Sequence, residues 1–190
     1  ALDGCRPTPH LPAMNQTAEI SGDENGEATR APLFDNFVVV LNETQNLVNI
    51  AGSIRAMMNM GIRRVRLVRP AEFDARRITG IAHGWGEIVA SAEFLDTLPE
   101  AVADAAHVVG TTARRRTARY VWEHPREAAP ALVELAASTT APIALVFGRE
   151  DAGLSNDDLD LCDRTLTVPT DTKHWSLNLA QAVLQVCYEL

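Results

Sequence analysis

The sequence predicts an α/β fold in which a mostly parallel sheet is flanked by helices. Short β-branched runs such as FVVVLN (37–42) and IALVFG (143–148) alternate along the chain with longer segments of helical composition. Strands that alternate with helices favour a parallel sheet covered on both faces. The 190 residues are 46% hydrophobic and 22% charged, which fits one globular domain with a large core.

The N-terminal segment 1–36 differs in composition from the rest of the chain. It is rich in Pro, Gly, Asn and Thr, its acidic side chains outnumber its basic ones, and its apolar residues have no period. We therefore expect a mobile tail over 1–36 and a folded domain over 37–190. Because Leu190 ends the chain inside a predicted helix, we also expect that a C-terminal extension is missing.

Runs rich in Val, Ile and Thr that end at small or turn-forming residues predict the strands of the sheet. Pro70 ends the second run, and the run over 87–91 is the weakest. The predicted strands are 37–42, 65–70, 87–91, 107–112, 143–148 and 164–169.

Capping residues mark the helices between these strands. Gly61 is a C-cap signal for the first helix, and Pro99 and Pro125 stand where proline favours a helix start. Ser155 or Asn156 is a suitable N-cap for a short helix after the strand at 143–148. The predicted helices are 47–60, 74–82, 98–105, 125–137, 156–162 and 176–190.

Ligands of open parallel sheets bind beyond the carboxyl ends of the strands. The most informative predicted ends are Gly110-Thr111-Thr112, Gly148-Arg149-Glu150 and Val168-Pro169-Thr170. Their small, hydroxylated or proline-containing turns let backbone amides approach a ligand.

Several function classes lack their sequence signals. The chain has no GxGxxG, GxxxxGKS or GxSxG motif, so a nucleotide-binding oxidoreductase is a disfavoured alternative that an NAD titration would test. The cysteines and histidines have no metal-ligand spacing, so we expect no metal. No run of 18 apolar residues is present, so we expect no membrane contact. The number of cysteines is odd (Cys5, Cys162 and Cys187), which favours a reducing compartment and therefore a cytoplasmic protein.

The charge distribution is more informative than the net charge of −8, which by itself argues against nucleic acid. Arginines cluster over 63–77 and again at Arg114, Arg115, Arg116 and Arg119. The planar guanidinium fork is suited to phosphate.

Polar segments at three predicted strand–helix junctions could converge on one crevice: 49–55, 147–154 and 176–180. They contain an Asn followed six residues later by Arg, the pattern GxExxGL, and a proline-containing strand end that leads to SLN. In this order the motifs resemble the SPOUT superfamily of RNA methyltransferases, in its SpoU/TrmH branch. The resemblance runs over 37–190 and is greatest to the TrmJ group, with VVGTTARRR (108–116) and SLNLAQAV (176–183) adding to it.

The resemblance implies a deep trefoil knot at the C-terminal end of the domain, a bound S-adenosylmethionine and a homodimer. It further implies methylation of the ribose 2′-hydroxyl of the tRNA anticodon-loop pyrimidine conventionally numbered 32. A ribosomal RNA 2′-O-methyltransferase of the same family and a catalytically silent RNA-binding paralogue remain alternatives.

The resemblance also assigns site residues. Arg55 matches the catalytic arginine, and because a guanidinium stays protonated we expect it to hold a phosphate and stabilise a developing alkoxide rather than act as a base. The catalytic set also contains Asn49, Glu150, Ser176 and Asn178. We expect Asn49 to cap the helix or position the substrate. We expect Glu150 to accept hydrogen bonds from the backbone or from Arg55. The expected cofactor residues are Thr111, Thr112, Phe147, Gly148, Arg149, Gly153, Val168, Pro169 and Leu177. The expected RNA contacts are Arg114, Arg115, Arg116 and Arg119.

Two segments depart from the family pattern. Ala51 stands where the family usually has glycine, with Gly52 following, and His174-Trp175 replaces a small, often Ser-containing stretch. Trp122 and Trp175 could stack a base, although packing in the core or an interface is the favoured interpretation. The apolar side chains of the last helix are expected to help form the dimer interface: Ala180, Val183, Leu184, Val186 and Cys187.

Overall fold

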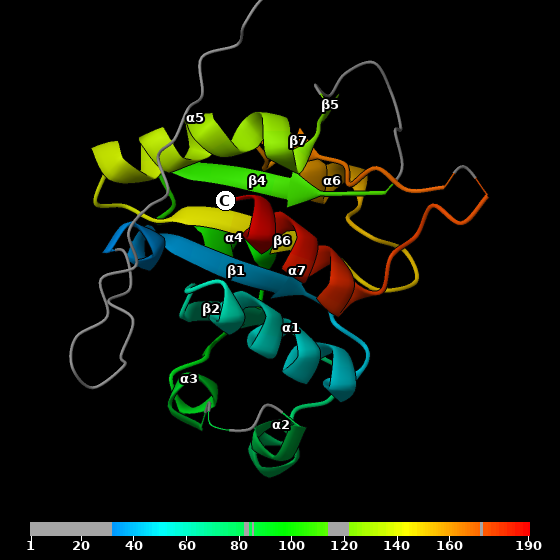
Figure 1. The fold of residues 1–190 in the computed structure, drawn as a ribbon. Helices are drawn as coiled ribbons and strands as arrows, with labels where there is room; N and C mark the ends of the chain where they lie inside the picture. The colour runs from blue at the N-terminus through cyan, green and yellow to red at the C-terminus, as the bar shows by residue number, and fades with distance from the viewer. Residues whose placement is uncertain (1–31, 82–83, 85, 114–121, 172) are drawn as a thin grey trace, which may run out of the picture. The chain divides into compact units, whose positions relative to one another are not determined.

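The computed structural model describes residues 32–81, 84, 86–113, 122–171 and 173–190 (Figure 1). Within them a seven-stranded sheet has the order β3-β2-β1-β6-β4-β7-β5, and every neighbouring pair is parallel. The predicted α/β class is thereby confirmed. The knot implied by the resemblance stays a prediction.

The strands follow the predicted runs closely where both faces are buried. Every residue of β1 and β6 is buried, because helices cover the sheet on both sides. The strands are β1 (Phe37–Asn42), β2 (Arg64–Val68), β3 (Glu93–Leu95), β4 (His107–Thr111), β5 (Trp122–Glu123), β6 (Ile143–Phe147) and β7 (Arg164–Leu166).

The helices also begin and end near their predicted caps. Gly61, just after α1, has a φ of 87°, and Ser155 and Thr97 each accept from the backbone N–H three residues on. The helices are η1 (Pro32–Asn36, 3-10), α1 (Leu47–Asn59), α2 (Ala75–Ile81), α3 (Gly86–Ala90), α4 (Leu98–Val102), α5 (Pro125–Ser138), α6 (Asn156–Leu159) and α7 (Leu179–Glu189).

The strand predicted at 87–91 is wrong, because this segment forms helix α3. A run of five residues is too short for periodicity to separate a strand from a helix. The third strand is instead β3, whose Glu93 and Phe94 are exposed at the edge of the sheet. An exposed edge strand has no continuous apolar run, and the two-residue strand β5 was missed for a similar reason.

The domain also begins earlier than predicted. The expected tail over 1–31 lies outside the described residues, but residues 32–36 form η1 rather than a tail. The Asn36 side-chain amide donates to the carbonyls of Ala136 (2.8 Å) and Thr139 (2.7 Å) at the end of α5. These bonds anchor η1 to the helix layer.

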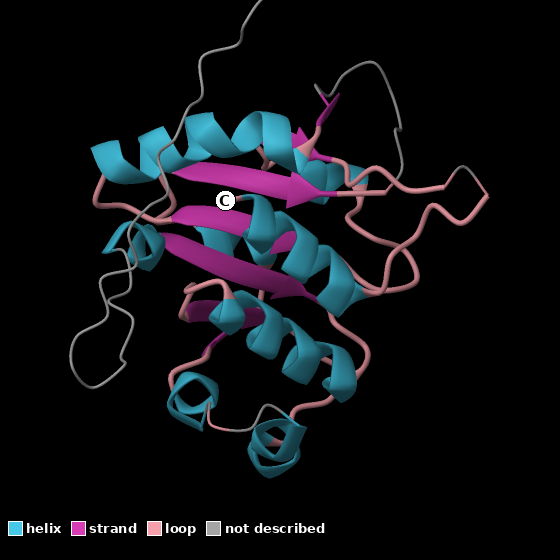
Figure 2. Ribbon diagram, in the orientation of Figure 1, coloured by secondary structure: helices cyan, strands magenta, loops and turns pink. Residues whose placement is uncertain are grey.

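Two apolar clusters separate the layers of the fold. Alternate residues of β1 (Phe37, Val39 and Leu41) pack with α1, α5 and α7 on one face. The intervening residues Val38 and Val40 pack with α4 and α6 on the other. Figure 2 shows helices on both sides of the sheet, with the long arrows of β1 and β4 pointing the same way.

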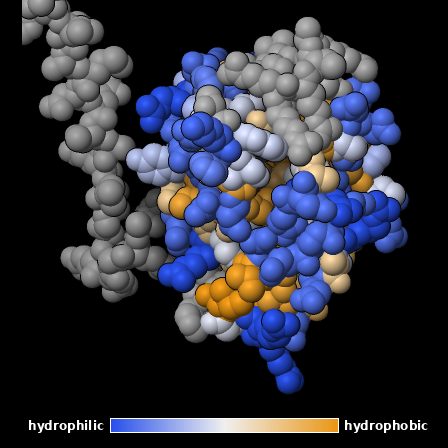
Figure 3. All heavy atoms as spheres, turned by 90° about the vertical axis from the view of Figure 1, so that its right-hand side faces the viewer, coloured by the Kyte–Doolittle hydropathy of each residue, from blue (hydrophilic) through white to orange (hydrophobic). Residues whose placement is uncertain are grey.

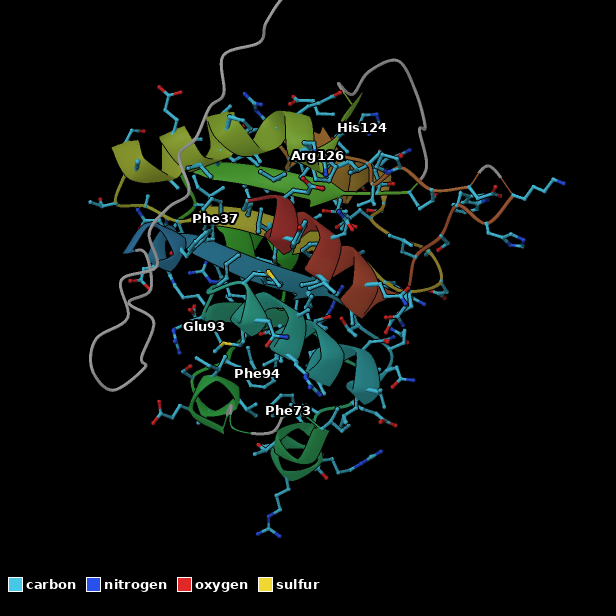
Figure 4. All side chains as sticks on the ribbon, in the orientation of Figure 1. Phe37, Phe73, Glu93, Phe94, His124 and Arg126 are labelled. Atoms are coloured by element: carbon cyan, nitrogen blue, oxygen red, sulfur yellow. The ribbon has the colours of Figure 1, made fainter. Side chains whose placement is uncertain are left out.

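Helices α1 and α7 lie side by side across the sheet (Figure 1). A β-carbon built on Gly52 would lie 2.8 Å from Cβ of Ala180, so glycine at 52 permits this close packing. Ala51 is fully buried in the core. At the opposite end of α7, Glu189 accepts from Arg126 of α5 at 3.0 Å (Figure 4).

One member of the 63–77 arginine cluster is buried within the protein and does not face solvent. Arg66 is 5% exposed and donates to Asp104 (2.6 and 2.8 Å), to Glu93 (3.1 Å) and to the carbonyl of Ala101 (2.8 Å). It joins β2 to β3 and α4. Hydrogen bonding to Asp104 raises the pKa of Arg66 and lowers the pKa of the Asp104 carboxyl.

Candidate functional site

The connections that follow β4, β6 and β7 line a pocket at the carboxyl edge of the sheet. The order β1-β6-β4-β7 places these strand ends next to one another. Figure 3 views the molecule from this side: hydrophilic residues dominate, with hydrophobic atoms visible between them near the centre. The lining residues are Thr111, Thr112, Ala113, Phe147, Gly148, Arg149, Glu150, Asp151, Ala152, Gly153, Val168, Trp175, Ser176, Leu177, Leu179 and Ala182.

A tight turn after β6 forms one wall of this pocket. A β-carbon on Gly148 would lie 2.3 Å from the backbone carbon of Gly153, so no side chain fits at 148. Gly153 has a φ of 69°, and its N–H donates to the Arg149 carbonyl at 2.8 Å. The two glycines therefore let the turn fold back on itself and bring Glu150 to the pocket.

Glu150 links this turn to the start of α1. Its carboxylate accepts from the backbone N–H groups of Gln45 (2.9 Å) and Asn46 (3.2 Å) and from the side-chain amide of Asn49 (2.8 Å). The predicted alternative of a bond to Arg55 is not present. A carboxylate at the N-terminal end of a helix is stabilised by the exposed N–H groups and the helix dipole.

Asn49 and Asn178 continue the link from Glu150 to α7. The Asn49 side-chain oxygen accepts from the Asn178 amide at 2.8 Å, and the Asn178 oxygen accepts from the Ala180 N–H at 3.0 Å. Asn178 is thus the N-cap of α7. The N-cap of α1 is Asn46 and not Asn49, because the Asn46 oxygen accepts from Val48 N–H.

The structure brings the three predicted segments together through this Glu150–Asn49–Asn178 network. The network draws on residues more than 100 positions apart, which places the openings of α1 and α7 beside the β6 turn. Ser176 is exposed and lines the pocket. Its expected role stays a prediction.

Arg55 lies on the exposed side of α1, beyond Asn49. Its guanidinium forms no hydrogen bond or ion pair with another described residue. A guanidinium with no intramolecular partner is available to a phosphate or another anion. Asn49, Arg55 and Asn178 are not among the residues that line the pocket.

Every predicted cofactor residue except Pro169 lines the pocket. The Thr111 hydroxyl is buried and has no hydrogen-bond partner within the described ranges. Sequence reasoning missed part of the lining, although most of these residues adjoin the motifs: Ala113, Asp151, Ala152, Trp175, Leu179 and Ala182. The period of α7 could have identified Leu179 and Ala182 as residues of its inner face.

Arg149 is held by acidic neighbours at the rim. Its Nε and Nη2 donate to the Asp151 carboxylate at 3.0 Å each, and its third nitrogen lies 3.7 Å from Glu43. Hydrogen bonding to Asp151 raises the pKa of Arg149, and the pKa of the Asp151 carboxyl is lowered in return. The rim therefore presents a fixed arginine whose charge is balanced within the protein.

The aromatic predictions have mixed outcomes. Trp175 is 40% exposed and lines the pocket, so core packing is wrong for this residue, and packing in an interface stays a prediction. The side chain of Trp122 lies outside the described part of the structure. The arginines expected to contact RNA, at 114–116 and 119, also lie outside it.

The predicted apolar interface of α7 requires a correction. Val183, Val186 and Cys187 are buried in the core, where they pack against the rest of the domain. Leu184 and Tyr188 are the large apolar side chains that α7 exposes, and Val48 is exposed on the neighbouring α1. Only one face of an amphipathic helix packs against its own domain, and the sequence alone did not indicate which apolar residues of α7 lie on that face.

The described ranges contain neither a metal-binding cluster nor a membrane-spanning helix. Within them no group of three or more His, Cys, Asp or Glu side chains is arranged to hold a metal ion. No helix in those ranges combines the length and apolarity needed to cross a bilayer.

Comparison with known proteins gives consistent matches. The model of the SpoU rRNA methylase family matches residues 36–188. The tRNA (cytidine/uridine-2′-O-)-methyltransferase TrmJ of Salmonella typhimurium is 39% identical over 158 residues, which are 83% of this chain and 64% of that protein. The Klebsiella pneumoniae TrmJ is 38% identical with the same coverage. The chain thus spans about two thirds of the length of these curated relatives.

Solved structures agree with these matches. A probable methylase family protein from Haemophilus influenzae has a TM-score of 0.75 and 38% identity, covering 82% of this chain and 65% of that one. TrmJ from Z. mobilis ZM4 has a TM-score of 0.73 and 36% identity, covering 80% and 67%.

Proposed function

The chain belongs to the SpoU rRNA methylase family, and on that premise we propose that it transfers a methyl group from S-adenosylmethionine to a ribose 2′-hydroxyl of RNA. The observation that carries the proposal is the Glu150–Asn49–Asn178 network beside the strand-end pocket. It joins the three sequence motifs of the family at one edge of the sheet.

The pocket is suited to a donor that combines an apolar body with hydrogen-bonding groups. Phe147, Val168 and Leu177 supply apolar surface, and the buried Thr111 hydroxyl lacks a partner within the described ranges. At Gly148 the wall of the pocket is formed by backbone, because the backbone of Gly153 occupies the space that a β-carbon would need. When bound, S-adenosylmethionine supplies an electrophilic methyl group on a positively charged sulfur.

The chain's own residues would align the acceptor and manage its charge. Glu150 and Asn49 fix the start of α1, and Arg55 is exposed farther along the same helix. Arg55 would bind the phosphate next to the reacting ribose and stabilise the oxygen as its proton leaves for solvent. Holding two reactants in line can supply about 7–11 kcal/mol of the barrier, so positioning is the main task of this network.

The acceptor that we propose is tRNA. The curated relatives that the chain matches are named as tRNA (cytidine/uridine-2′-O-)-methyltransferases. The pyrimidine numbered 32 in the anticodon loop is the proposed target. Loop nucleotides suit such an enzyme because their bases can be splayed out of the stack.

Phosphate contacts are proposed for the cluster Arg114, Arg115, Arg116 and Arg119. In the sequence this cluster directly follows Ala113, which lines the pocket. Each phosphate neutralised in a single-stranded region contributes about −0.7 to the slope of log K against log salt. Replacing two of these arginines with alanine should therefore make the slope less steep by about 1 to 1.5.

A homodimer is proposed through the exposed sides of α1 and α7. Val48, Leu184 and Tyr188 are 52%, 41% and 65% exposed, and these two helices lie side by side. A second copy seated there would remove this apolar surface from water. Sedimentation of Tyr188→Arg beside the parent protein tests the assignment, since the variant should sediment as a monomer.

Nucleoside mass spectrometry tests the proposed reaction. Unmodified tRNA and ribosomal RNA transcripts are incubated separately with protein and isotopically labelled S-adenosylmethionine, then digested. A labelled 2′-O-methylpyrimidine from tRNA is the expected product. Label in ribosomal RNA alone would retain the chemistry and reject the tRNA substrate, and no label in either would reject the reaction.

Arg55→Ala and Arg63→Ala form a matched pair for this assay. Both remove an exposed arginine, but Arg63 precedes β2 and lies toward the amino edge of the sheet. We expect Arg55→Ala to abolish methyl transfer while donor binding by calorimetry is retained, and Arg63→Ala to leave both unchanged. Loss of donor binding in Arg55→Ala would show that its role is different.

A further inference from the structure

A second pocket opens beside the pocket proposed to bind S-adenosylmethionine, hereafter the donor pocket. Residues of the turn after β6, among them Arg149 and Gly153, line both pockets. Leu98 of the second pocket belongs to the apolar cluster on the α4 face of the sheet, whereas Leu179 of the donor pocket belongs to the cluster on the α7 face. These two helices lie on opposite sides of the sheet (Figure 1). The turn therefore separates two pockets that adjoin different faces of the sheet.

The second pocket lies where an open parallel sheet is expected to bind a ligand. It has a volume of about 550 Å³ and is lined by the ends of β1 and β2 and the starts of α4 and α6. The chain runs from β1 through β2 to β3 at one edge of the sheet, and β4 then lies on the other side of β1. Such a reversal leaves a crevice at the carboxyl ends of the strands, and ligand pockets commonly have volumes of about 300–1,000 Å³.

The side chain of Asn42 indicates that this pocket binds a polar ligand. Asn42 is the last residue of β1 and lines the pocket, and it continues the row of Val38 and Val40 that faces α4 and α6. It is 6% exposed, and its carboxamide has no hydrogen-bond partner among the described residues. A buried amide without a partner costs free energy that a valine in the same row would not cost. A ligand that pairs with the amide accounts for asparagine at this position.

The charges around the pocket favour a neutral ligand over a free phosphate. The two arginines of the lining, Arg69 and Arg149, are both ion-paired with Glu43. Asp157 also lines the pocket, and its carboxylate has no partner within the described ranges. A carboxylate only accepts hydrogen bonds, so it would pair with an amino group, and Leu154 adds apolar surface. A nucleobase combines a flat apolar face with amino donors and ring acceptors, and it therefore suits this lining.

We propose that the second pocket binds a base of the acceptor RNA, on a nucleotide that flanks the methylated one, and that the Asn42 amide pairs with the edge of this base. The proposal rests on the proposed function and adds a recognition site to it. An asparagine amide presents one donor and one acceptor side by side, as the edge of a base such as adenine does. Because the turn at 148–153 borders both pockets, an RNA strand that crosses it can place the target ribose in the donor pocket and a flanking base in the second. Loop nucleotides can be splayed out of the stack to make such contacts.

The test compares Asn42→Val with a control, Asn59→Val. Asn59 is exposed at the last residue of α1 and lines neither pocket. Both variants exchange a carboxamide for a small apolar side chain. Because the Asn42 amide has no partner in the protein, Asn42→Val should unfold at the parent's Tm or above it. A lower Tm for Asn42→Val would contradict the premise that this amide is kept for a ligand.

Asp157→Asn is a second variant that does not depend on the folding of Asn42→Val. Asp157 is exposed, and its replacement removes a negative charge while the shape of the side chain is kept. Loss of the charge alone would tighten RNA binding, since the RNA is anionic. Weaker binding by Asp157→Asn is expected if the carboxylate accepts from an amino group of the base, and tighter binding would contradict that contact.

Two binding measurements separate the acceptor from the donor. Fluorescence anisotropy gives the Kd for an anticodon stem-loop RNA, and calorimetry gives the Kd for S-adenosylhomocysteine. A well-formed amide–base pair corresponds to about 5- to 150-fold in Kd. We expect Asn42→Val to weaken stem-loop binding within this range and Asn59→Val to match the parent. The Kd for S-adenosylhomocysteine should change by less than about twofold in both variants. Unchanged stem-loop binding by Asn42→Val would refute the proposal.

Abasic stem-loops identify the base that is bound. Two RNAs lack the base on the 5′ or the 3′ side of the target pyrimidine, and a third lacks the target base itself. With one of the two flanking abasic RNAs, the parent and Asn42→Val should bind equally well, because the contact is already absent. The loss caused by Asn42→Val should persist in the RNA without the target base. A loss that persists in both flanking abasic RNAs would refute the assignment to a flanking base.

Free adenosine and cytidine distinguish the two sources of a nucleobase. Calorimetry with each nucleoside shows whether the pocket takes a base that is not part of RNA. We expect weak nucleoside binding beside strong, Asn42-dependent binding of the stem-loop, because a free nucleoside lacks the phosphate contacts. Nucleoside binding that requires Asn42, with RNA binding that does not, would overturn the proposal and assign the pocket to a free nucleoside.

The recognition site and the proposed reaction fail in different ways. Absence of methyl transfer, with stem-loop binding that still depends on Asn42 and on a flanking base, would reject the reaction and retain the site. Normal methyl transfer with stem-loop binding indifferent to Asn42 would reject the site and retain the reaction.

Discussion

Replacing Glu150 with alanine tests whether the network beside the pocket positions the site. The carboxylate accepts from two backbone N–H groups at the start of α1 and from the Asn49 amide. The variant removes all three acceptor contacts together with the negative charge at the helix N-terminus. The Asn49 side chain then loses the contact that fixes its orientation, so the hydrogen bond that it accepts from Asn178 no longer holds α7 in one position relative to α1.

The expected loss of stability is moderate because Gln45 and Asn46 are exposed. Water can satisfy their N–H groups, so we estimate a loss of about 1–2 kcal/mol from the hydrogen bonds and the helix dipole. For a domain of this size that corresponds to a fall in Tm of roughly 2–8 °C. Misplacement of the reacting groups by about 1 Å can cost on the order of 100-fold in rate, so kcat should fall by about that factor.

The assay combines steady-state methyl transfer, donor binding by calorimetry and thermal unfolding. Glu150→Gln should be intermediate, because its amide oxygen can accept while its NH2 group faces backbone donors. Glu72→Ala removes an exposed carboxylate from the β2–α2 connection and serves as the control. Wild-type kcat in Glu150→Ala would refute the positioning role, and a large loss of donor affinity at unchanged kcat would mean that Glu150 contacts the donor.

Other predictions concern packing, acid stability and thiol chemistry. Gly52→Ala places a β-carbon 2.8 Å from Cβ of Ala180 and should destabilise the protein by about 1–3 kcal/mol, measured by urea unfolding; an unchanged midpoint would show that the two helices can separate freely. Because Arg66 lowers the pKa of Asp104, the stability from this pair is present above about pH 4 and is lost as pH falls through the lower folded value. The difference in unfolding free energy between the parent and Asp104→Asn should therefore shrink below pH 4; a difference that is constant with pH would contradict this. Burial raises the pKa of the Cys162 thiol to about 12, so its alkylation by iodoacetamide at pH 8 should be more than about 100-fold slower in the native protein than in urea, and equal rates would argue against burial.

Most elements of the fold could be predicted because their signals are local. The buried strands β1 and β6 are continuous apolar runs, and the starts of α4 and α6 coincide with capping residues. The errors fall where short segments lack such a signal. The helix α3 reads equally well as a strand, and the edge strand β3 has exposed residues that give no apolar pattern.

The sequence by itself determined which residue types stand at the strand ends and in what order the motifs occur. Only the tertiary structure decided what these residues contact. Asn49 reads as the N-cap of the first helix until the bond from Val48 N–H to Asn46 is known, and Trp175 reads as a packing residue of the core or an interface until its exposure is known. Parallel pairing brings Glu150, Asn49 and Asn178 together across more than 100 residues, and no local pattern encodes contacts of that separation.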